Sequence, residues 1–184
     1  MEMVLSLALG IGLSAATGFR IFVPALLASG ASLMGWISPG EGFEWLATWP
    51  AFAVFATASI VEVGAYYIPW VDNALDTVAV PGSVLAGGLL ATSFLEIDSP
   101  MLQWVVGMMA GGSTAGFIQG GTALLRGAST ATTGGLANPV VSTSENLAAV
   151  TVSTASIFVP VLGFTLALMV GWVVWRGWRR LRSG

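Results

Sequence analysis

Between Met3 and Gly40 the sequence contains a single charged residue, Arg20. As one helix, the apolar run from Met3 to Trp36 would be about 51 Å long at a rise of 1.5 Å per residue. Only 8% of the whole chain is charged, against about 25% in a typical soluble domain. A soluble domain of 184 residues needs far more charge than this to cover its surface. We therefore expect an all-α integral membrane protein that forms one polytopic domain over residues 1–184.

Apolar segments of roughly 20 residues are long enough to cross a bilayer as helices. We predict five transmembrane segments, at residues 3–36, 50–68, 78–95, 101–125 and 147–175. The first segment is too long for one upright crossing and short for two. It is either one long tilted helix or a helix that breaks near Gly18 and Pro24 and re-enters the membrane. Two crossings there would raise the number of transmembrane helices to six.

The segments between these helices differ in character. The spacing of apolar residues over 69–79 predicts a short interfacial helix, which Pro81 ends. Residues 126–146 are polar but almost uncharged, which indicates a loop. The basic tail at 176–184 is expected to face the cytoplasm, because positively charged flanks stay on that side of a membrane. Five crossings then place the N-terminus outside.

The residue types exclude several kinds of chemistry. The chain contains no cysteine and no histidine, which removes disulfides, thiolate nucleophiles, imidazole bases and the usual zinc or haem ligands. Any metal would have to be a hard cation bound by oxygen. Hydrolase, metalloprotease and nucleotide-binding motifs are absent. We expect no cofactor and no catalytic residue, and the short basic tail does not indicate a nucleic-acid partner.

Two weak internal repeats are present. At an offset of 98, Gly18 and Phe19 align with Gly116 and Phe117. Three predicted spans separate the two copies, so the second would run in the opposite direction, as in the inverted repeats of transporters. The letters Ile-Phe-Val-Pro also occur twice, beginning at Ile21 and at 157, but at a different offset. The two repeats cannot both be real.

Arg20 has two interpretations. A charge at the bilayer centre costs about 2.5–3.5 kcal/mol on insertion scales, so it needs a partner, water or a place inside the helix bundle. In that case Arg20 binds an anion or an acidic side chain at a helix break. Alternatively, Arg20 lies about 26 Å along the helix from Met3 and extends its side chain to the membrane interface.

Three acidic residues are candidates for a binding site. Glu62 lies well inside the second predicted span, and small residues share its helix face. It is a candidate proton or cation site, a partner for Arg20, or a neutral glutamic acid hydrogen-bonded within the bundle. Asp72 and Asp76 are four residues apart, on one side of the predicted interfacial helix. Together with Glu62 they would form a cation site, or they are simply the solvated face of that helix.

The polar segment 126–146 is the last candidate region. Non-helical backbone is tolerated at membrane depth only where it lines a cavity or is buried in protein. Such a loop would present hydroxyl and amide groups to a solute, whereas the alternative is an ordinary exposed loop. The candidate binding residues in and before this segment are Gln119, Thr132, Thr133, Asn138 and Glu145.

Several of these runs resemble one protein family. They are "GFRIFVP", Glu62 followed by "VDNALD", and "STATTGGLANP" followed by Glu145. They are similar to the bacterial membrane proteins called domain of unknown function 4126, and the resemblance covers nearly the whole chain. It implies a multi-span protein of the bacterial cytoplasmic (inner) membrane. It also implies that Arg20, Glu62, the two aspartates and residues 130–139 belong to one site, but it implies no activity.

Three functions are compatible with this pattern. Polar groups from distant segments that all need shelter from lipid favour a small transporter or channel-like protein for an ion or a small polar solute. The alternative is a non-catalytic binding or scaffold protein that forms a homodimer through small-residue helix faces. An intramembrane lipid-modifying enzyme is the third, and the missing cysteine and histidine count against it. In each case the lipid bilayer is the main partner.

Overall fold

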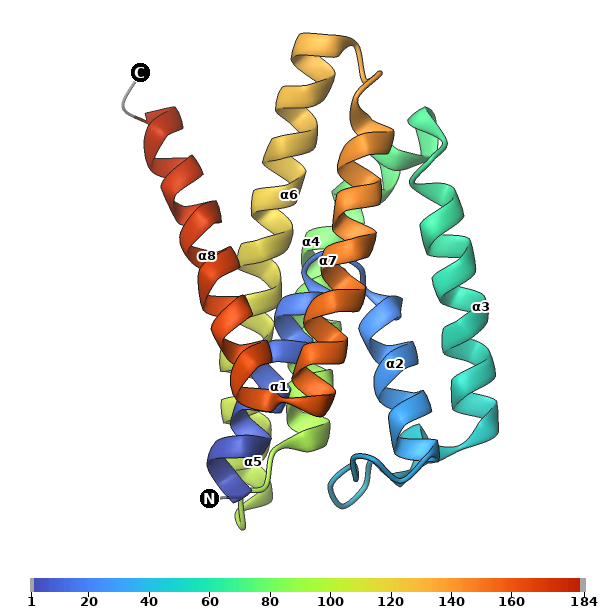
Figure 1. Ribbon diagram of the computed structural model, residues 1–184, viewed down its shortest axis with the longest axis vertical. Helices are drawn as coiled ribbons and strands as arrows, with labels where there is room; N and C mark the ends of the chain where they lie inside the picture. Colours follow the sequence, from blue (N-terminus) through green and yellow to red (C-terminus); the bar gives the residue numbers. More distant parts are fainter. Residues whose placement is uncertain (1, 183–184) are drawn as a thin grey trace.

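The computed structural model describes residues 2–182, apart from the side chains of residues 69, 70, 72, 73, 76 and 180–182. Within the described part of the chain, all regular secondary structure is helical (Figure 1). The elements are α1 (Glu2–Thr17), α2 (Phe22–Leu33), the 3₁₀ helix η1 (Glu44–Ala47), α3 (Trp49–Ala65), α4 (Pro69–Phe94), α5 (Pro100–Val106), the π-helical segment η2 (Gly107–Gly111), α6 (Gly112–Thr133), α7 (Asn138–Phe158) and α8 (Pro160–Arg182).

The first two helices form a short hairpin inside the bundle. α1 starts at the end of the molecule that carries the N-terminus and reaches only about half of the bundle's height (Figure 1). α2 then returns to the same end, where the loop containing η1 leads into α3. We call this end the N-terminal end and the opposite one, where α8 finishes, the C-terminal end. At 1.5 Å per residue, α1 is about 24 Å long and α2 about 18 Å.

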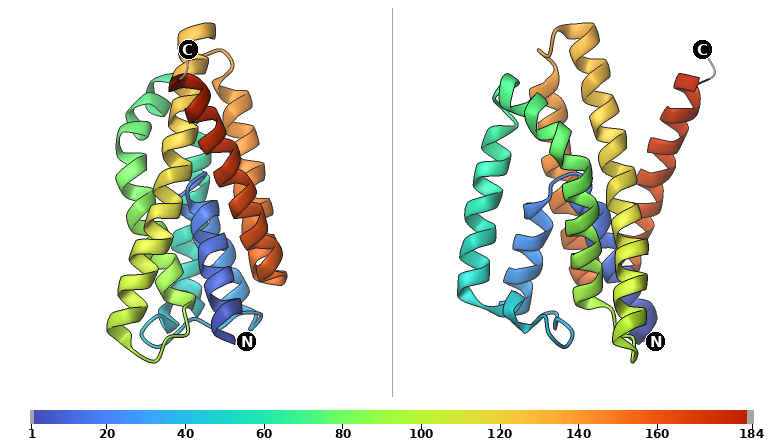
Figure 2. Two further views of the ribbon diagram at one scale, coloured as in Figure 1. Left: turned by 90° about the vertical axis from the view of Figure 1, so that its left-hand side faces the viewer. Right: turned by 180° about the vertical axis from the view of Figure 1, so that it is seen from behind.

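The remaining helices alternate in direction along the long axis of the bundle. α3 runs towards the C-terminal end, α4 returns, the rod formed by α5, η2 and α6 runs up again, α7 comes back and α8 ends the chain (Figure 2). α1 lies in the middle and contacts α4, α6, α7 and α8. α3 packs mainly against α2, so it stands apart from the rest of the bundle.

The long first segment, 3–36, is therefore two helices and not one tilted helix. The break follows Thr17, and Gly18 lies where the chain presses closest to α6. A Cβ on Gly18 would lie 2.7 Å from the Ala115 carbonyl oxygen, closer than a real side chain comes to backbone. Pro24 falls in the first turn of α2, where a missing amide hydrogen costs no helical bond.

At two prolines, Pro81 and Pro160, the predicted helix boundaries differ from the observed ones. The expected interfacial helix over 69–79 is not separate, because α4 continues through Pro81 to Phe94. A proline inside a helix removes one hydrogen bond, and the rest of α4 is long enough to continue without it. The last predicted segment, 147–175, breaks at Val159 into α7 and α8, with Pro160 as the first residue of α8.

The polar segment 126–146 is helical, contrary to the predicted loop. α6 continues to Thr133 and α7 begins at Asn138, which leaves a connection of residues 134–137. Gly134 and Gly135 have φ values of 64° and 87°, a left-handed conformation in which glycine is unstrained. Of its polar residues, Arg126, Asn138, Ser142 and Glu145 are buried on the inward faces of the two helices.

The two sequence repeats differ in backbone structure. The offset of 98 aligns Gly18, at a helix break, with Gly116, inside the continuous helix α6. Each copy of Ile-Phe-Val-Pro lies at a break: α2 starts at Phe22, and α7 ends at Phe158 just before Pro160.

Glycines allow the central helices to approach each other closely. A Cβ on Gly111 would lie 2.5 Å from the Ala91 Cβ and 2.6 Å from the Gly87 carbonyl oxygen, and one on Gly116 would lie 2.5 Å from the Val84 side chain. The glycine-rich face of the η2–α6 rod is therefore packed against α4 within the chain. This face is already occupied, so a homodimer would have to use another surface.

Apolar side chains lie both in the core and on the surface, and small polar side chains are buried among them. Large apolar side chains such as Ile60 on α3 and Leu168 on α8 are exposed, whereas Ser14, Ser29 and Thr92 are fully buried. The buried hydroxyls bond to backbone carbonyls, as between Ser14 Oγ and the Gly87 oxygen at 2.6 Å. By length and composition, two described helical segments are apolar enough to cross a membrane, Thr77–Phe94 and Pro160–Arg179.

Candidate functional site

The break between α1 and α2 carries the most deeply buried charge. Only 1% of Arg20 is exposed, and its guanidinium group binds three residues of α7. Nε donates to Asn146 Oδ1 at 2.6 Å, Nη1 to Glu145 Oε2 at 2.9 Å and Nη2 to the Ser142 carbonyl oxygen at 3.2 Å. Because residues 142, 145 and 146 share one face of α7, this helix offers Arg20 three acceptors at once.

A second buried arginine shares the same carboxylate. Arg126 of α6 is 2% exposed, and its Nε donates to Glu145 Oε1 at 3.2 Å. Its Nη2 also bonds and ion-pairs with Glu145 Oε2. Glu145, itself 3% exposed, therefore bridges two guanidinium groups that come from the α1–α2 break and from α6. We call these three residues the charge cluster.

Tyr66, at the C-terminus of α3, connects the charge cluster with the third helix. The guanidinium carbons of Arg20 and Arg126 each lie 4.1 Å from the centre of its ring. The Tyr66 backbone carbonyl also accepts a hydrogen bond from Ser142 Oγ at 3.4 Å. An aromatic ring attracts a cation to its face, so Tyr66 stabilises the two arginines in a place that excludes water.

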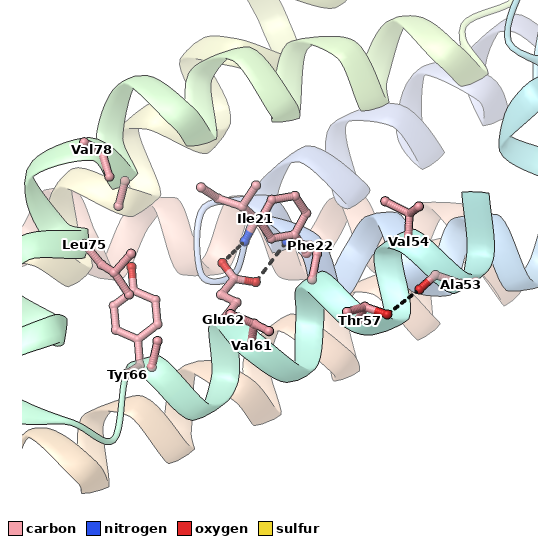
Figure 3. Close-up of a pocket in the computed structure, with 13 residues that line it drawn as sticks. Ile21, Phe22, Ala53, Val54, Thr57, Val61, Glu62, Tyr66, Leu75 and Val78 are labelled. Atoms are coloured by element: carbon pink, nitrogen blue, oxygen red, sulfur yellow. Dashed lines mark hydrogen bonds between the residues drawn. The ribbon is translucent and has the colours of Figure 1, made fainter. Parts of the chain in front are cut away.

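Glu62 of α3 binds the other side of the helix break. Its Oε1 accepts a hydrogen bond from the Ile21 amide at 2.7 Å and its Oε2 accepts one from the Phe22 amide at 3.0 Å (Figure 3). These amides belong to the first turn of α2 and have no carbonyl partner within that helix. The N-terminus of a helix attracts negative charge, so a carboxylate is the matching group for this position.

The two ends of the broken helix thus have caps of opposite charge. The C-terminus of α1 is the negative end of its dipole, and there Arg20 Nη1 donates to the Phe19 carbonyl oxygen at 3.1 Å. The N-terminus of α2 is the positive end of its dipole, and there Glu62 accepts two hydrogen bonds. The break therefore satisfies its backbone with side chains at a depth where water is scarce.

A groove leads from the surface to Glu62. It has a volume of about 680 Å³ and lies between the start of α2, the length of α3 and the first half of α4 (Figure 3). Its lining is almost entirely apolar, with Val54, Val61, Leu75 and Val78 among the side chains, and Glu62 is the one charged residue that lines it among those described. The groove exists because α3 packs mainly against α2 and not against α4.

Three of the predicted site residues come together in this way. Arg20, Glu62 and Glu145 meet at the break, although the direct ion-pair partner of Arg20 is Glu145 and not Glu62. Gln119 is buried on the same face of α6 as Arg126, two turns away from it. The backbones of Asp72 and Asp76 belong to α4, and their side chains lie outside the described part of the structure.

The remaining predicted residues lie at the α6–α7 connection, away from the charge cluster. Thr132 and Thr133 are exposed, and their hydroxyls bond to the carbonyls of Ala128 at 2.8 Å and Ser129 at 2.7 Å in their own helix. Asn138 is buried at the start of α7, where its Nδ2 donates to Thr130 Oγ1 at 3.2 Å. The two threonines thus lie apart from the charge cluster, and Asn138 joins the ends of α6 and α7.

Four contributors were not predicted as site residues: Tyr66, Arg126, Ser142 and Asn146. Helical periodicity contained the signal for two of them, Arg126 and Ser142. Arg126 follows Gln119 by seven residues, and the buried residues of α7 recur at intervals of three or four through its polar half. The prediction of a loop over 126–146 concealed this pattern. Tyr66 gave no such signal, because tyrosine near a helix end usually indicates a membrane interface.

The chain was compared with known proteins in three ways. The model of one family, DUF4126, described as a domain of unknown function, matches residues 7–180. Comparisons with curated proteins and with solved structures found no match. Among the described residues, no group of three or more acidic side chains is arranged to hold a metal ion. The family match covers both arginines, Tyr66 and both glutamates of the site, and the chain belongs to the DUF4126 family.

Proposed function

We propose that the protein is a small bacterial inner-membrane transporter or channel-like protein that moves an ion or a small polar solute. The observation that carries the proposal is the charged helix break at half the height of the bundle. There α1 and α2 meet, and Arg20, Glu62 and Glu145 converge from three separate parts of the chain. The protein would lie in the membrane, bind the solute at the helix break and admit it through the groove that leads to Glu62.

The distribution of side chains supports the membrane location. Exposed leucine, valine, isoleucine and tryptophan side chains occur along α3, α4, α6, α7 and α8, and serine, threonine and arginine are buried. Such a surface would be unstable in water and is expected in lipid. In this arrangement five helical rods cross the bilayer, and α1 and α2 form a hairpin that enters it from the N-terminal end and returns to the same end.

The helix break supports the solute site. Backbone that leaves the helical path at membrane depth is tolerated where it is buried in protein or lines a cavity, and transporters bind solutes where broken helices meet. A charge so deep in a bundle is costly and is typical of a functional site. Arg20 and Glu62 are sufficient to cap the two helix ends. Arg126 and Glu145 do not bond to the α2 amides, so the cluster contains two charged residues that capping does not require.

The chemistry of the site favours an anion. Two guanidinium groups and a helix N-terminus are the groups that proteins use to bind carboxylate or phosphate oxygens. In the structure the carboxylates of Glu145 and Glu62 occupy these positions. A small anion would exchange with one of these resident carboxylates, and the groove between α3 and α4 offers Glu62 room to move.

The membrane location is tested by labelling from the two sides. The chain has no cysteine, so a cysteine introduced at Ser38 or at Thr132 is the only thiol present. Both positions are exposed, and they lie at opposite ends of the bundle. A membrane-impermeant maleimide added to intact cells should label Ser38→Cys and should label Thr132→Cys only after the membrane is permeabilised. Equal labelling of both in intact cells would contradict the topology.

Transport is tested in liposomes containing the purified protein. Stopped-flow light scattering follows swelling when potassium acetate, phosphate or chloride is added with valinomycin, and glycerol serves as a neutral solute. We expect at least one anion to enter faster than it enters empty liposomes. Arg20→Gln should slow that entry by roughly tenfold or more, since removing one partner of a buried pair costs more than about 1.4 kcal/mol. Glu62→Gln should also slow it, because the group that caps α2 loses its charge.

A matched control separates the site from general charge effects. Glu41 is an exposed acid in the loop at the N-terminal end, and Glu41→Gln removes the same charge as Glu62→Gln. This control should transport like the unmodified protein, and all variants should elute as single peaks in size-exclusion chromatography. If no solute enters faster than it enters empty liposomes, or if Glu41→Gln slows entry as much as Glu62→Gln, the proposal is wrong.

A further inference from the structure

A second groove, distinct from the one at Glu62, lies on the other side of the molecule. α8 leans away from α6 towards the C-terminal end (Figure 1), and the space between these helices and α1 has a volume of about 680 Å³. The residues that line it are Ile11, Ser113, Thr114, Phe117, Ile118, Ala167, Leu168, Gly171, Trp172 and Trp175. None of them belongs to the charge cluster.

The interior of this groove is apolar despite its two hydroxyl residues. Ser113 Oγ and Thr114 Oγ1 both donate to the Ala110 carbonyl oxygen, one turn earlier in the same rod, at 3.2 Å and 2.7 Å. Their hydroxyls are therefore directed to backbone and not to a ligand. What remains is a surface of methyl, methylene and aromatic groups, which fits a hydrocarbon chain.

Two arginines lie beside the groove's tryptophans. The guanidinium carbon of Arg176 is 5.1 Å from the centre of the Trp172 ring, and that of Arg179 is 4.9 Å from the Trp175 ring. Both tryptophans line the groove, so the stacking holds two positive charges at its edge. α8 contains no aspartate or glutamate from Pro160 to Arg182, so the helix supplies no anion of its own to these arginines.

We propose that this groove binds one anionic phospholipid, with an acyl chain between α6 and α8 and the phosphate group at Arg176 and Arg179. Charge complementarity selects this occupant. A neutral hydrocarbon would leave the stacked arginines unused, whereas an anionic headgroup has the charge and the oxygen atoms that guanidinium groups bind. Tryptophan and arginine beside each other near a helix end are typical of the headgroup region of a bilayer. The proposal rests on the membrane location given above but not on transport.

Native mass spectrometry of the full chain tests this proposal, because it counts lipids retained after release from a micelle. The protein is equilibrated with equal amounts of phosphatidylglycerol and phosphatidylcholine. We expect one phosphatidylglycerol molecule to be retained in preference to phosphatidylcholine. The double variant Arg176→Gln/Arg179→Gln should lower this preference roughly tenfold, since each arginine near an anionic lipid contributes to binding. Equal retention of the two lipids by the unmodified protein overturns the proposal.

Two pairs of variants test whether the retained lipid binds in the groove between α6 and α8. A Cβ on Gly171 would meet no atom within 4 Å, so Gly171→Leu fills the groove without a clash. Gly64 of α3 is equally open, and Gly64→Leu is the control. Gly171→Leu should lose the retained lipid, and Gly64→Leu should keep it. The double variant Arg180→Gln/Arg182→Gln, which removes the same charge from the tail, should keep the preference. If it loses as much preference as the first double variant, the charge acts without the groove and the proposal fails.

Discussion

The four letters Ile-Phe-Val-Pro occur at two helix breaks, and the two breaks are built differently. The first, between α1 and α2, lies at half the height of the bundle, and the second, between α7 and α8, lies lower, nearer its N-terminal end (Figure 1). At the first break Val23 is 7% exposed, whereas at the second the equivalent Val159 is 50% exposed. The same short motif is thus used once inside the protein and once at its surface.

The difference lies in what satisfies the backbone. At the second break the motif's Ile157 and Phe158 are still in the last turn of α7, and the first turn of α8 closes on its own backbone, where the amides of Leu162 and Gly163 bond to the Val159 carbonyl oxygen at 2.8 Å and 3.1 Å. At the first break the amides of Ile21 and Phe22 depend on the Glu62 carboxylate. Proline is compatible with a new helix in both places, but only the buried break requires charged side chains. The position of a break in the bundle, and not its local sequence, therefore determines whether it becomes a site.

Removing the acid that bridges the two arginines should have the largest effect. Glu145→Gln leaves Arg20 and Arg126 buried without their shared anion, and we expect a loss of about 3–5 kcal/mol in unfolding free energy. Unfolding in mixed detergent micelles with increasing dodecyl sulfate measures it. Glu96→Gln, which neutralises an exposed acid at the N-terminal end, should change the midpoint very little. Equal midpoints for the two variants would show that the first break does not depend on its charges.

The two breaks should respond alike to loss of their glycines. A Cβ on Gly18 would lie 2.7 Å from the Ala115 carbonyl oxygen, and one on Gly163 would lie 2.2 Å from Ser156 Oγ. We expect Gly18→Ala and Gly163→Ala each to lose about 1–3 kcal/mol, because the tight packing of neighbouring helices must open. Gly64→Ala, where a Cβ meets no atom within 4 Å, should gain about 0.5–1 kcal/mol from its better helix propensity. The same unfolding assay gives all three values, and a neutral Gly18→Ala would contradict the close approach at the first break.

The sequence is compatible with a tilted helix or a broken helix over the first segment, and the structure has the broken one. An isolated Arg20 between Gly18 and Pro24 indicates that an apolar run is interrupted, and the interruption is where the structure has it. Which acid neutralises Arg20 depends on how α3 and α7 pack around the hairpin. Glu62 lies in an apolar segment and Glu145 in a polar one, but only tertiary structure distinguishes the helix cap from the ion-pair partner.

The predicted loop over residues 126–146 is wrong because it was based on composition. Residues 126–146 are rich in serine, threonine and glycine, which in a soluble protein favours a loop. In this bundle small polar residues are also buried, so Arg126, Ser142 and Glu145 lie on the inward faces of two helices. Reading residues 119, 126, 138, 142 and 145 at helical spacing would have predicted two helices and placed Arg126 beside Glu145.

The caps of the two breaks are compared by a third pair of variants. Glu62→Ala leaves the Ile21 and Phe22 amides without their acceptor, and we expect it to cost about 1–2 kcal/mol, as does loss of a helix cap. Pro160→Ala removes no acceptor at the second break and should change stability by less than about 1 kcal/mol. Hydrogen exchange of the amides in the first turns of α2 and α8 provides the local readout. Glu62→Ala should speed exchange in the first turn of α2, and Pro160→Ala should leave exchange in α8 unchanged. Faster exchange in α8 alone would mean that the second break, and not the first, depends on its cap.

The smallest expected effect compares equivalent positions of the repeated motif. Val23→Thr and Val159→Thr make the same nearly isosteric change, one at a buried site and one at an exposed site. Burying a hydroxyl costs about 1–3 kcal/mol in proteins, but a helical threonine recovers part of that by bonding to its own helix. We therefore expect Val23→Thr to cost about 1 kcal/mol and Val159→Thr to stay within about 0.5 kcal/mol. Thermal melts in one detergent, with both variants measured against the unmodified chain, resolve this difference. Equal shifts would mean that burial does not distinguish the two breaks, and the charges at the first break would then need a cause other than its depth in the bundle.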